Sequence, residues 1–410
     1  MHLHSSQEKS ESHLIDFQCK RISLHSLKLL MMETLPRAHG FEVVGNSPGC
    51  AIRRAPGYTG SSALSVLAGG IAQRAFPGAA FAVSRSGNIV LQGAIGRFTY
   101  DEASEDVTLS TVFDLASVTK VVATTAMAMS LCDRGRLNLQ QRVVDLLPEF
   151  ATDDARRKHI TVEMLLAHSS GLPAYERLFE RARSREALIK LAFKVPLVAA
   201  PGTHAEYSDI GFILLGDILE TIAGEPLDIF CAREIWAKLR MKSTCFRPAE
   251  RFRSQIPPTR DDREFRYRVI QGEVHDENAS VMGGVAGHAG AFGTTSDLML
   301  FSAAMLGYGP ELFQKETIAL FTRRQSSPAG TSRALGWDTP SPPSQSGQCF
   351  SPSSFGHLGY TGTSLWIDGE RKIAIALLTN RTWPDNQSKL IKQIRPAFHD
   401  AVMEEVLRIE

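Results

Sequence analysis

The pattern of apolar and polar positions predicts helices through most of the chain and strands near both of its ends. Apolar residues recur three or four positions apart, the period of a helix with one buried face. Predicted helices cover residues 61–74, about 115–134, 141–147, 162–167, 185–193, 211–222, 227–239, 296–306, 313–323 and 388–407. Apolar and β-branched runs predict strands over residues 79–84, 88–96, 357–368 and 371–379.

This order of elements predicts an α+β fold, in which an antiparallel sheet is flanked by helices and carries an inserted, mainly helical domain. The sheet part is expected at about 60–112 and 280–410, and the insertion at about 113–279. Residues 115–240 are expected to be almost wholly helical. Asp368-Gly369 is a strong hairpin signal, and we expect this hairpin to pair in the same sheet as residues 79–84.

The first 45 residues differ from the rest, being rich in Ser, His, Glu and Lys with one apolar patch at Leu27–Met32. We expect a disordered tail ahead of a folded domain over 46–410, with a short helix at Leu24–Met32 left open. No charged start is followed by an apolar core and a small-residue cleavage site, so no secretory signal is predicted. This favours a cytoplasmic location, and a periplasmic one stays open if the true start differs.

Composition narrows the class of protein. Of the 410 residues, 43% are hydrophobic and 22% charged, as in ordinary soluble globular chains. The net charge of +1 gives no electrostatic case for binding nucleic acid or an anionic membrane. The longest apolar stretches, near Val121–Cys132 and Ile373–Leu378, are too short for a membrane span of about 20 residues. Nothing in the sequence indicates an oligomeric state.

The six cysteines are scattered and form no Cys-x-x-Cys pair. This favours free thiols in a reducing compartment over a disulfide framework or a zinc site. The glycine-rich run at 281–293 lacks the Lys and Ser/Thr of a phosphate-binding loop. No metal or other cofactor is therefore predicted.

Ser117 and Lys120 stand three residues apart in an apolar stretch, which would place them one turn apart on one helix face. A serine hydroxyl needs a base within hydrogen-bond reach to become a good nucleophile. Lysine can be that base if burial lowers its pKa from about 10.4. Asp114 is the predicted N-cap of this helix. The spacing alone fits an ordinary core helix with a buried hydroxyl and a snorkelling lysine as well.

Two further motifs carry candidate chemistry. Tyr207-Ser-Asp209 precedes a predicted helix, where a phenol could be held in a cleft, or where a buried tyrosine could simply precede Asp209 as the N-cap. His357-Leu-Gly359-Tyr360 opens the late hairpin. Gly359 would let the strand pass close to a ligand, whereas His357 alone is equally typical of a half-exposed strand residue.

These three segments, in this order, resemble the serine β-lactamase/penicillin-binding-protein superfamily, most of all its class C branch with the family VIII carboxylesterases and D-amino-acid peptidases. The resemblance covers roughly 60–405 and implies a β-lactamase/transpeptidase-like catalytic domain. Linking phrases that also resemble the family lie at residues 165–173, 207–212, 283–290 and 362–368.

The resemblance implies a role for each matching position. Ser117 would be the acylated nucleophile, Lys120 would accept its proton, and Tyr207 would relay a proton to the leaving group and help to activate the deacylating water. The backbone N–H groups of Ser117 and Tyr360 would form the oxyanion hole. Residues expected to bind substrate are Asp209, His357, Gly359 and Tyr360.

The sequence departs from the β-lactamase pattern at two positions. The third motif usually begins with lysine, and His357 supplies no permanent charge for a substrate carboxylate. The second motif usually ends in asparagine, and an ionised Asp209 can only accept hydrogen bonds. The sequence thus predicts a serine hydrolase for a small ester or amide, in first place a carboxylesterase. The alternatives are a β-lactamase or D-alanyl peptidase, and a non-turnover acyl-binding sensor protein.

Overall fold

The structure is a computed structural model that describes residues 42–47 and 49–409. Its main sheet has seven strands in the order β1-β2-β4-β3-β12-β11-β10, and every neighbouring pair is antiparallel. In that order the strands span Glu42–Ser47, Cys50–Arg54, Asn88–Gly96, Gly78–Arg85, Ile373–Thr379, Ser364–Asp368 and Phe355–Leu358. The predicted disordered tail and the helix at Leu24–Met32 lie almost wholly outside the described residues, although β1 begins before the predicted start of the folded domain.

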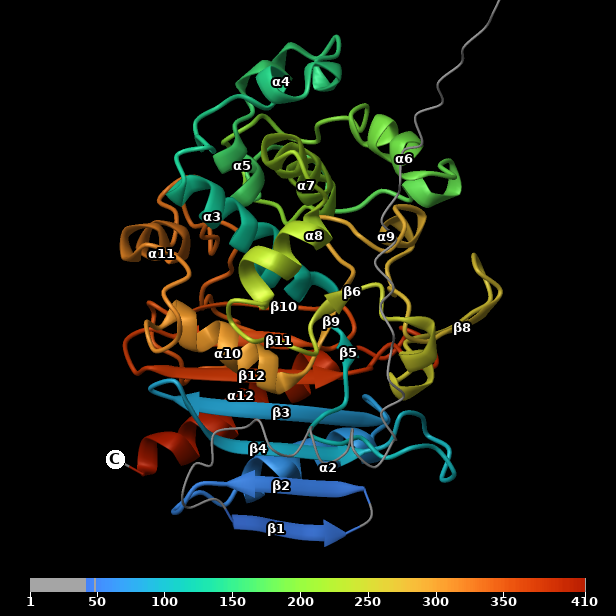
Figure 1. The fold of residues 1–410 in the computed structure, drawn as a ribbon, viewed down its shortest axis with the longest axis vertical. Helices are drawn as coiled ribbons and strands as arrows, with labels where there is room; N and C mark the ends of the chain where they lie inside the picture. Colours follow the sequence, from blue (N-terminus) through green and yellow to red (C-terminus); the bar gives the residue numbers. More distant parts are fainter. Residues whose placement is uncertain (1–41, 48, 410) are drawn as a thin grey trace, which may run out of the picture. The chain divides into compact units, whose positions relative to one another are not determined.

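Pairing of β3 with β12 joins the two ends of the chain in one sheet, as predicted for the hairpin around Gly369. Figure 1 shows this junction as a blue strand beside a red one. Side chains alternate along both strands. Phe81 and Ile375 enter one hydrophobic cluster, whereas Ala80 and Ala376 enter the other. This period of two is expected for a sheet that is buried on both faces.

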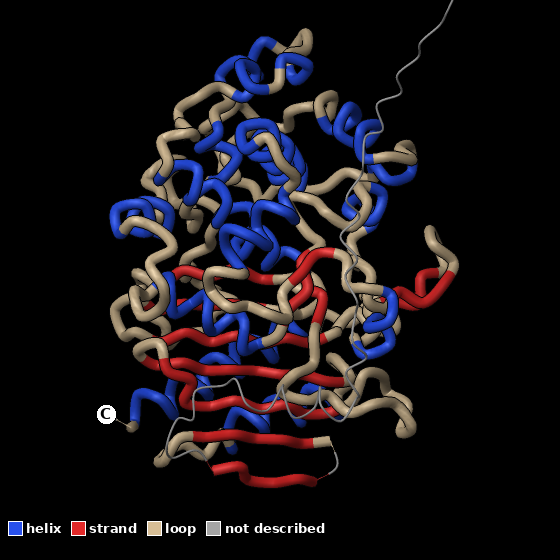
Figure 2. The backbone as a smooth tube through the Cα atoms, in the orientation of Figure 1, coloured by secondary structure: helices blue, strands red, loops and turns tan. Residues whose placement is uncertain are grey.

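Helices cover both faces of the sheet. The helices α2 (Ser61–Ala72) and α12 (Ile391–Arg408) pack together and enclose one cluster with the sheet. On the other face α10 (Thr295–Met305) packs against β3 and β12, and α11 (Lys315–Thr322) follows it. The four predicted helices are confirmed within a few residues, and together with the sheet they confirm the α+β fold class (Figure 2).

Residues 115–240 contain helices and no strand, but the prediction that they are almost wholly helical is wrong. Loops connect short helices over much of this segment because its glycines, prolines and polar clusters interrupt the helical period. The helical elements are η1 Ala116–Val118, η2 Lys120–Thr125, α3 Ala126–Asp133, α4 Val143–Leu146, η3 Pro148–Phe150, η4 Ala155–His159, α5 Val162–Leu166, η5 Leu178–Glu180, α6 Arg185–Ala192, α7 Asp209–Ala223, α8 Leu227–Cys231 and η6 Ala232–Trp236.

Short strands that the pattern did not predict lie beside this segment. The strands β5 (Phe113–Asp114), β9 (Ala291–Gly293) and β6 (Cys245–Phe246) form a small sheet, and β7 (Arg260–Asp262) pairs with β8 (Arg268–Ile270). Two or three residues are too few to show a period of two. The remaining helical elements are η7 Glu250–Gln255 and α9 Glu277–Val281. Among the described residues no helix is long and apolar enough to cross a membrane.

Candidate active site

Ser117 and Lys120 lie where β5 turns into the central helix. Ser117 is in the 3₁₀ turn η1, and Lys120 is the first residue of the π-helical segment η2, which continues into α3. The ammonium nitrogen of Lys120 donates to Ser117 Oγ at 3.0 Å. The predicted one-turn relationship is therefore present, although the helix around it is wound as 3₁₀ and π turns rather than as a regular α-helix.

The backbone before Ser117 is strained and tightly held. Ala116 has φ +47°, which an L-residue rarely adopts. Its N–H donates at 2.8 Å to the side chain of Asp114, which belongs to β5 and is not the predicted N-cap of the helix. The hydroxyls of Thr361 and Thr363 bond the carbonyls of Asp114 and Leu115 at 2.8 and 3.0 Å. These bonds tie the nucleophile turn to the loop that follows β10.

Lys120 is fully buried and held by three acceptors. Besides Ser117 Oγ, its ammonium donates to Asp209 Oδ1 at 2.6 Å and to the carbonyl of His288 at 2.9 Å. Burial lowers the pKa of Lys120, whereas the charge of Asp209 raises it, and the net direction is downward. A lowered pKa increases the fraction of neutral lysine that can accept a proton from Ser117.

Tyr207 lies in the loop before α7 and contacts two of the groups that hold Lys120, namely Ser117 and Asp209. Its hydroxyl lies 2.7 Å from Ser117 Oγ and donates to Asp209 Oδ1 at 2.9 Å. Ser208, and not Asp209, caps α7 by accepting the N–H of Gly211 at 3.0 Å. Burial and then the Asp209 charge raise the pKa of Tyr207 far above its usual value, so the phenol is neutral.

His168 supports the Tyr207 ring, a contact to which sequence analysis assigned no role. Its ring centre lies 4.9 Å from that of Tyr207 and 5.0 Å from that of Phe212. His168 Nδ1 accepts the N–H of Ser208 at 3.0 Å, so this nitrogen carries no proton. Burial and then the charge of Arg333 lower the pKa of His168 well below its usual value. A neutral imidazole thus fixes the position of the tyrosine.

His357 lies beside Tyr207, with 6.1 Å between ring centres, and is buried rather than half-exposed. Its Nδ1 donates to the Leu358 carbonyl at 2.8 Å, which leaves Nε2 as a lone-pair acceptor that is buried and has no partner among the described residues. Burial and then the charge of Lys120 lower the pKa of His357 well below its usual value. This position therefore supplies no positive charge.

Gly359 brings the loop after β10 against the nucleophile turn. A Cβ atom on Gly359 would lie 2.6 Å from the Leu115 carbonyl and 1.9 Å from Thr363 Oγ1, so only glycine allows this approach. The next residue, Tyr360, is half exposed, and its backbone N–H has no acceptor among the described residues. An N–H group that is free in this position is available to a ligand.

Arg333 is a site residue that the sequence pattern did not indicate. Its guanidinium carbon lies 5.6 Å from the centre of the Tyr207 ring, and its side chain is 20% exposed. The distance from Arg333 to Asp338 Oδ1 is 3.6 Å, which is longer than a hydrogen bond. Arg333 lies in an irregular polar loop, where no period or motif could single it out.

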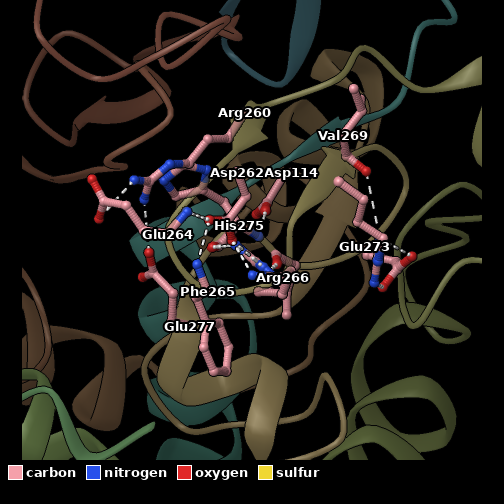
Figure 3. Close-up of polar contacts among 12 residues, drawn as sticks. Asp114, Arg260, Asp262, Glu264, Phe265, Arg266, Val269, Glu273, His275 and Glu277 are labelled. Carbon is pink, nitrogen blue, oxygen red and sulfur yellow. Dashed lines mark hydrogen bonds and ion pairs between the residues drawn. The ribbon is translucent and has the colours of Figure 1, made fainter. Parts of the chain in front are cut away.

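A buried polar network lies behind the nucleophile turn (Figure 3). Asp114 Oδ2 accepts the N–H of His275 at 2.7 Å. Arg266 holds the carbonyls of Val274 and His275 and forms an ion pair with the buried Asp262 at 2.8 Å. Burial raises the pKa of Asp114 to about 6, since its two backbone donors only partly offset the loss of water.

This constellation provides the parts of an acyl-transfer site. It combines a hydroxyl nucleophile, a buried lysine with a lowered pKa, a neutral phenol within hydrogen-bond reach, and a free backbone N–H nearby. Among residues 42–47 and 49–409, no group of three or more His, Cys, Asp or Glu side chains could hold a metal ion. The arrangement brings together the residues that the sequence singled out and adds Arg333 and His168.

One family model and several known proteins are similar to this chain. A family model described as Beta-lactamase matches residues 64–396. An N-acetylmuramyl-L-alanine amidase of Bacillus subtilis (strain 168) is 35% identical over 345 residues, 75% of this chain and 77% of the relative. A putative D-alanyl-D-alanine carboxypeptidase of Escherichia coli (strain K12) is 33% identical over 305 residues, 67% of this chain and 70% of the relative.

Among solved structures, EstCE1, a hydrolase with promiscuous acyltransferase activity, superposes with a TM-score of 0.68. The match covers 83% of this chain and 98% of that protein at 22% identity. At this identity the likeness concerns the fold alone.

Proposed function

This chain belongs to the beta-lactamase family, and from that premise we propose that it is a serine hydrolase working through an acyl-enzyme on Ser117. Neutral Lys120 accepts the Ser117 proton as Oγ attacks the substrate carbonyl. The resulting oxyanion is bound by the N–H groups of Ser117 and Tyr360. Tyr207 passes a proton to the leaving group as the carbonyl bond to it breaks, and a water then hydrolyses the acyl-enzyme along the same proton path.

For the substrate, we propose an amide or peptide bond close to a free carboxylate, as the names of the amidase and carboxypeptidase relatives suggest. The observation that carries this proposal is the Arg333 guanidinium beside Tyr207. Arginine keeps its charge and binds carboxylates in a bidentate manner. Its pairing with Asp338 is loose, so a substrate carboxylate can compete for it.

The carboxylesterase prediction remains the second candidate because of His357. With a lowered pKa and a free acceptor nitrogen, this residue offers no attraction to an anion and suits an uncharged acyl group. Ester leaving groups are also easier to expel than amines. A non-turnover acyl-binding protein would use the same acylation chemistry without hydrolysing the product.

The test compares N-acyl-D-alanyl-D-alanine, the same peptide with a C-terminal carboxamide, and p-nitrophenyl butyrate. We expect the Arg333→Gln variant to lose about 10- to 150-fold in kcat/KM on the free carboxylate alone, because a charge-assisted hydrogen bond contributes about 1.5–3 kcal/mol. Arg324→Gln, a change in the same loop, is the matched control. Equal losses on all three substrates would contradict the carboxylate role. Turnover of the ester alone would favour the carboxylesterase, and a stoichiometric burst without steady state would favour the acyl-binding protein.

A further inference from the structure

Two buried arginines lie behind the segment Gly359–Thr361. Their side chains have no role in the reaction proposed above. Arg395, from α12, donates to the Gly359 carbonyl at 3.3 Å. Arg381 donates through Nε to the Tyr360 carbonyl at 2.6 Å, and its guanidinium carbon lies 4.2 Å from the centre of the Tyr360 ring. The side chain of Arg395 is therefore directed at the peptide that precedes Tyr360.

Neither arginine has a carboxylate partner among the described residues. The other bond of Arg395 goes to the neutral amide oxygen of Gln345 at 3.3 Å, and its Nε has no partner there. Only 5% of Arg395 is exposed, and burial followed by the charge of Arg381 lowers its pKa. A buried charge without a counter-ion lowers the stability of the folded state. The position of Arg395 is therefore not explained by a contribution to stability.

The geometry of the peptide bond supplies another explanation. The Gly359 carbonyl and the Tyr360 N–H belong to the same planar peptide unit and point in opposite directions. The Gly359 carbonyl accepts from Arg395 and also from the N–H of Gly362 at 3.0 Å. Donors on a carbonyl polarise its peptide and strengthen the hydrogen bond that its N–H can give.

We propose that Arg395 is a positioning residue that orients and polarises the Gly359–Tyr360 peptide, so that the Tyr360 N–H binds the oxyanion more strongly. Arg381 holds the following peptide in place from the same side. This inference rests on the proposed acyl-enzyme at Ser117. In this inference the charge of Arg395 stabilises the transition state, whereas the charge of Arg333 binds the substrate.

The test is the carbonyl stretching frequency of the acyl-enzyme, measured by difference infrared spectroscopy with a ¹³C-labelled butyryl group from p-nitrophenyl butyrate. In Arg395→Met, which keeps an unbranched, flexible side chain and removes the charge, we expect the band to move to higher wavenumber. We also expect kcat to fall about 2- to 8-fold, since polarisation accounts for about 10–30% of a hydrogen bond that is worth 10²–10³ in rate. The KM should stay unchanged. In Arg395→Lys, which keeps a positive charge, both the shift of the band and the fall in kcat should be smaller than in Arg395→Met.

Arg157→Met is the matched control, because Arg157 is also buried and also bonds two backbone carbonyls, those of Phe193 and Val195. It should lower the melting temperature without moving the infrared band. An unmoved band in Arg395→Met, or in the equally uncharged Arg395→Gln if the methionine variant does not fold, would overturn the inference. Absence of a labelled acyl-enzyme in the wild type would instead contradict the proposed function itself.

Discussion

Asp209 Oδ1 lies 2.6 Å from the ammonium nitrogen of Lys120, a contact that works against the role proposed for that lysine. The carboxylate stabilises the charged lysine, whereas burial favours the neutral form that accepts a proton. The same oxygen accepts the Tyr207 hydroxyl at 2.9 Å. Asp209 therefore sets the balance between the two proton carriers of the site.

Replacing Asp209 with asparagine should shift the pH dependence of acylation. Loss of the carboxylate lowers the pKa of Lys120 further, so neutral lysine persists to lower pH. The acid limb of the kcat/KM profile for p-nitrophenyl butyrate should then move to lower pH. Asp217→Asn, on the same helix but paired with Arg185, is the control that should leave the limb in place. A limb that moves upward would mean that Lys120 is not the proton acceptor.

Lys120→Ala and Tyr207→Phe should each lower kcat by about 10²-fold or more, because general acid–base catalysis typically contributes 10²–10⁴. Tyr207→Phe removes the hydroxyl and keeps the ring contact with His168. Since both groups serve one proton path through Ser117 Oγ, the double variant should lose much less than the product of the single losses. Fully multiplicative losses would assign the two residues to separate steps.

The Asp114 carboxyl should stabilise the folded state more at low pH than at neutral pH. Its pKa is raised to about 6 in the folded protein, against about 3.9 when unfolded, so the folded state binds the proton more tightly. The associated stabilisation is present below the unfolded pKa and is lost as pH rises through about 6. In Asp114→Asn the free energy of unfolding at pH 4 minus that at pH 7 should be smaller than in the wild type by about 2–3 kcal/mol.

Chemical denaturation at the two pH values measures this difference. Asp262→Asn is the control. Burial disfavours the Asp262 charge, but the Arg266 side chain and backbone donors hold its folded-state pKa below its usual range. The Asp262 side chain is thus ionised in the folded state throughout this interval, and its replacement should change the difference little. An Asp114→Asn difference equal to that of the wild type would show that the Asp114 carboxyl does not titrate between these pH values.

His357→Lys should favour β-lactams that carry a carboxylate over simple esters. The change introduces a cation beside Tyr207, where the present imidazole is neutral. A charge-assisted hydrogen bond sets an upper limit of about 10- to 150-fold on the gain in the kcat/KM ratio of nitrocefin to p-nitrophenyl butyrate. The gain should be larger with Asp209→Asn, which removes a competitor for the ammonium. An unchanged ratio in both backgrounds would place His357 outside the acyl site.

The site motifs could be predicted from sequence because each is short and local. Ser117 and Lys120 share one turn, and Tyr207 and Asp209 flank one helix cap, so spacing places the two members of each pair near each other, and the family resemblance joined the two pairs in one site. Arg333 could not be found in this way, since an irregular loop carries it to Tyr207. The same applies to the buried network around Asp114, whose partners come from distant loops without apolar period.

The fold shows the same division between periodic and irregular segments. Long amphipathic elements such as α2 and α12 were predicted within a few residues, because their apolar faces repeat over several turns. The strands β1 and β2, at one edge of the sheet, were missed, since neither shows a regular alternation of apolar and polar residues. The Ala116 turn, with its positive φ, was missed as well, because it is held by bonds from Thr361 and Thr363, which lie far along the chain.

The acyl-enzyme on Ser117 is tested most directly by the mass of the intact protein after incubation with a fluorophosphonate and, separately, with p-nitrophenyl butyrate quenched in acid. We expect one covalent adduct per chain in both cases, located on Ser117 by peptide mapping and absent from Ser117→Ala, whose melting temperature stays close to that of the wild type. Adduct formation on another residue, or ester hydrolysis by Ser117→Ala within a few-fold of the wild-type rate, would contradict this assignment to Ser117.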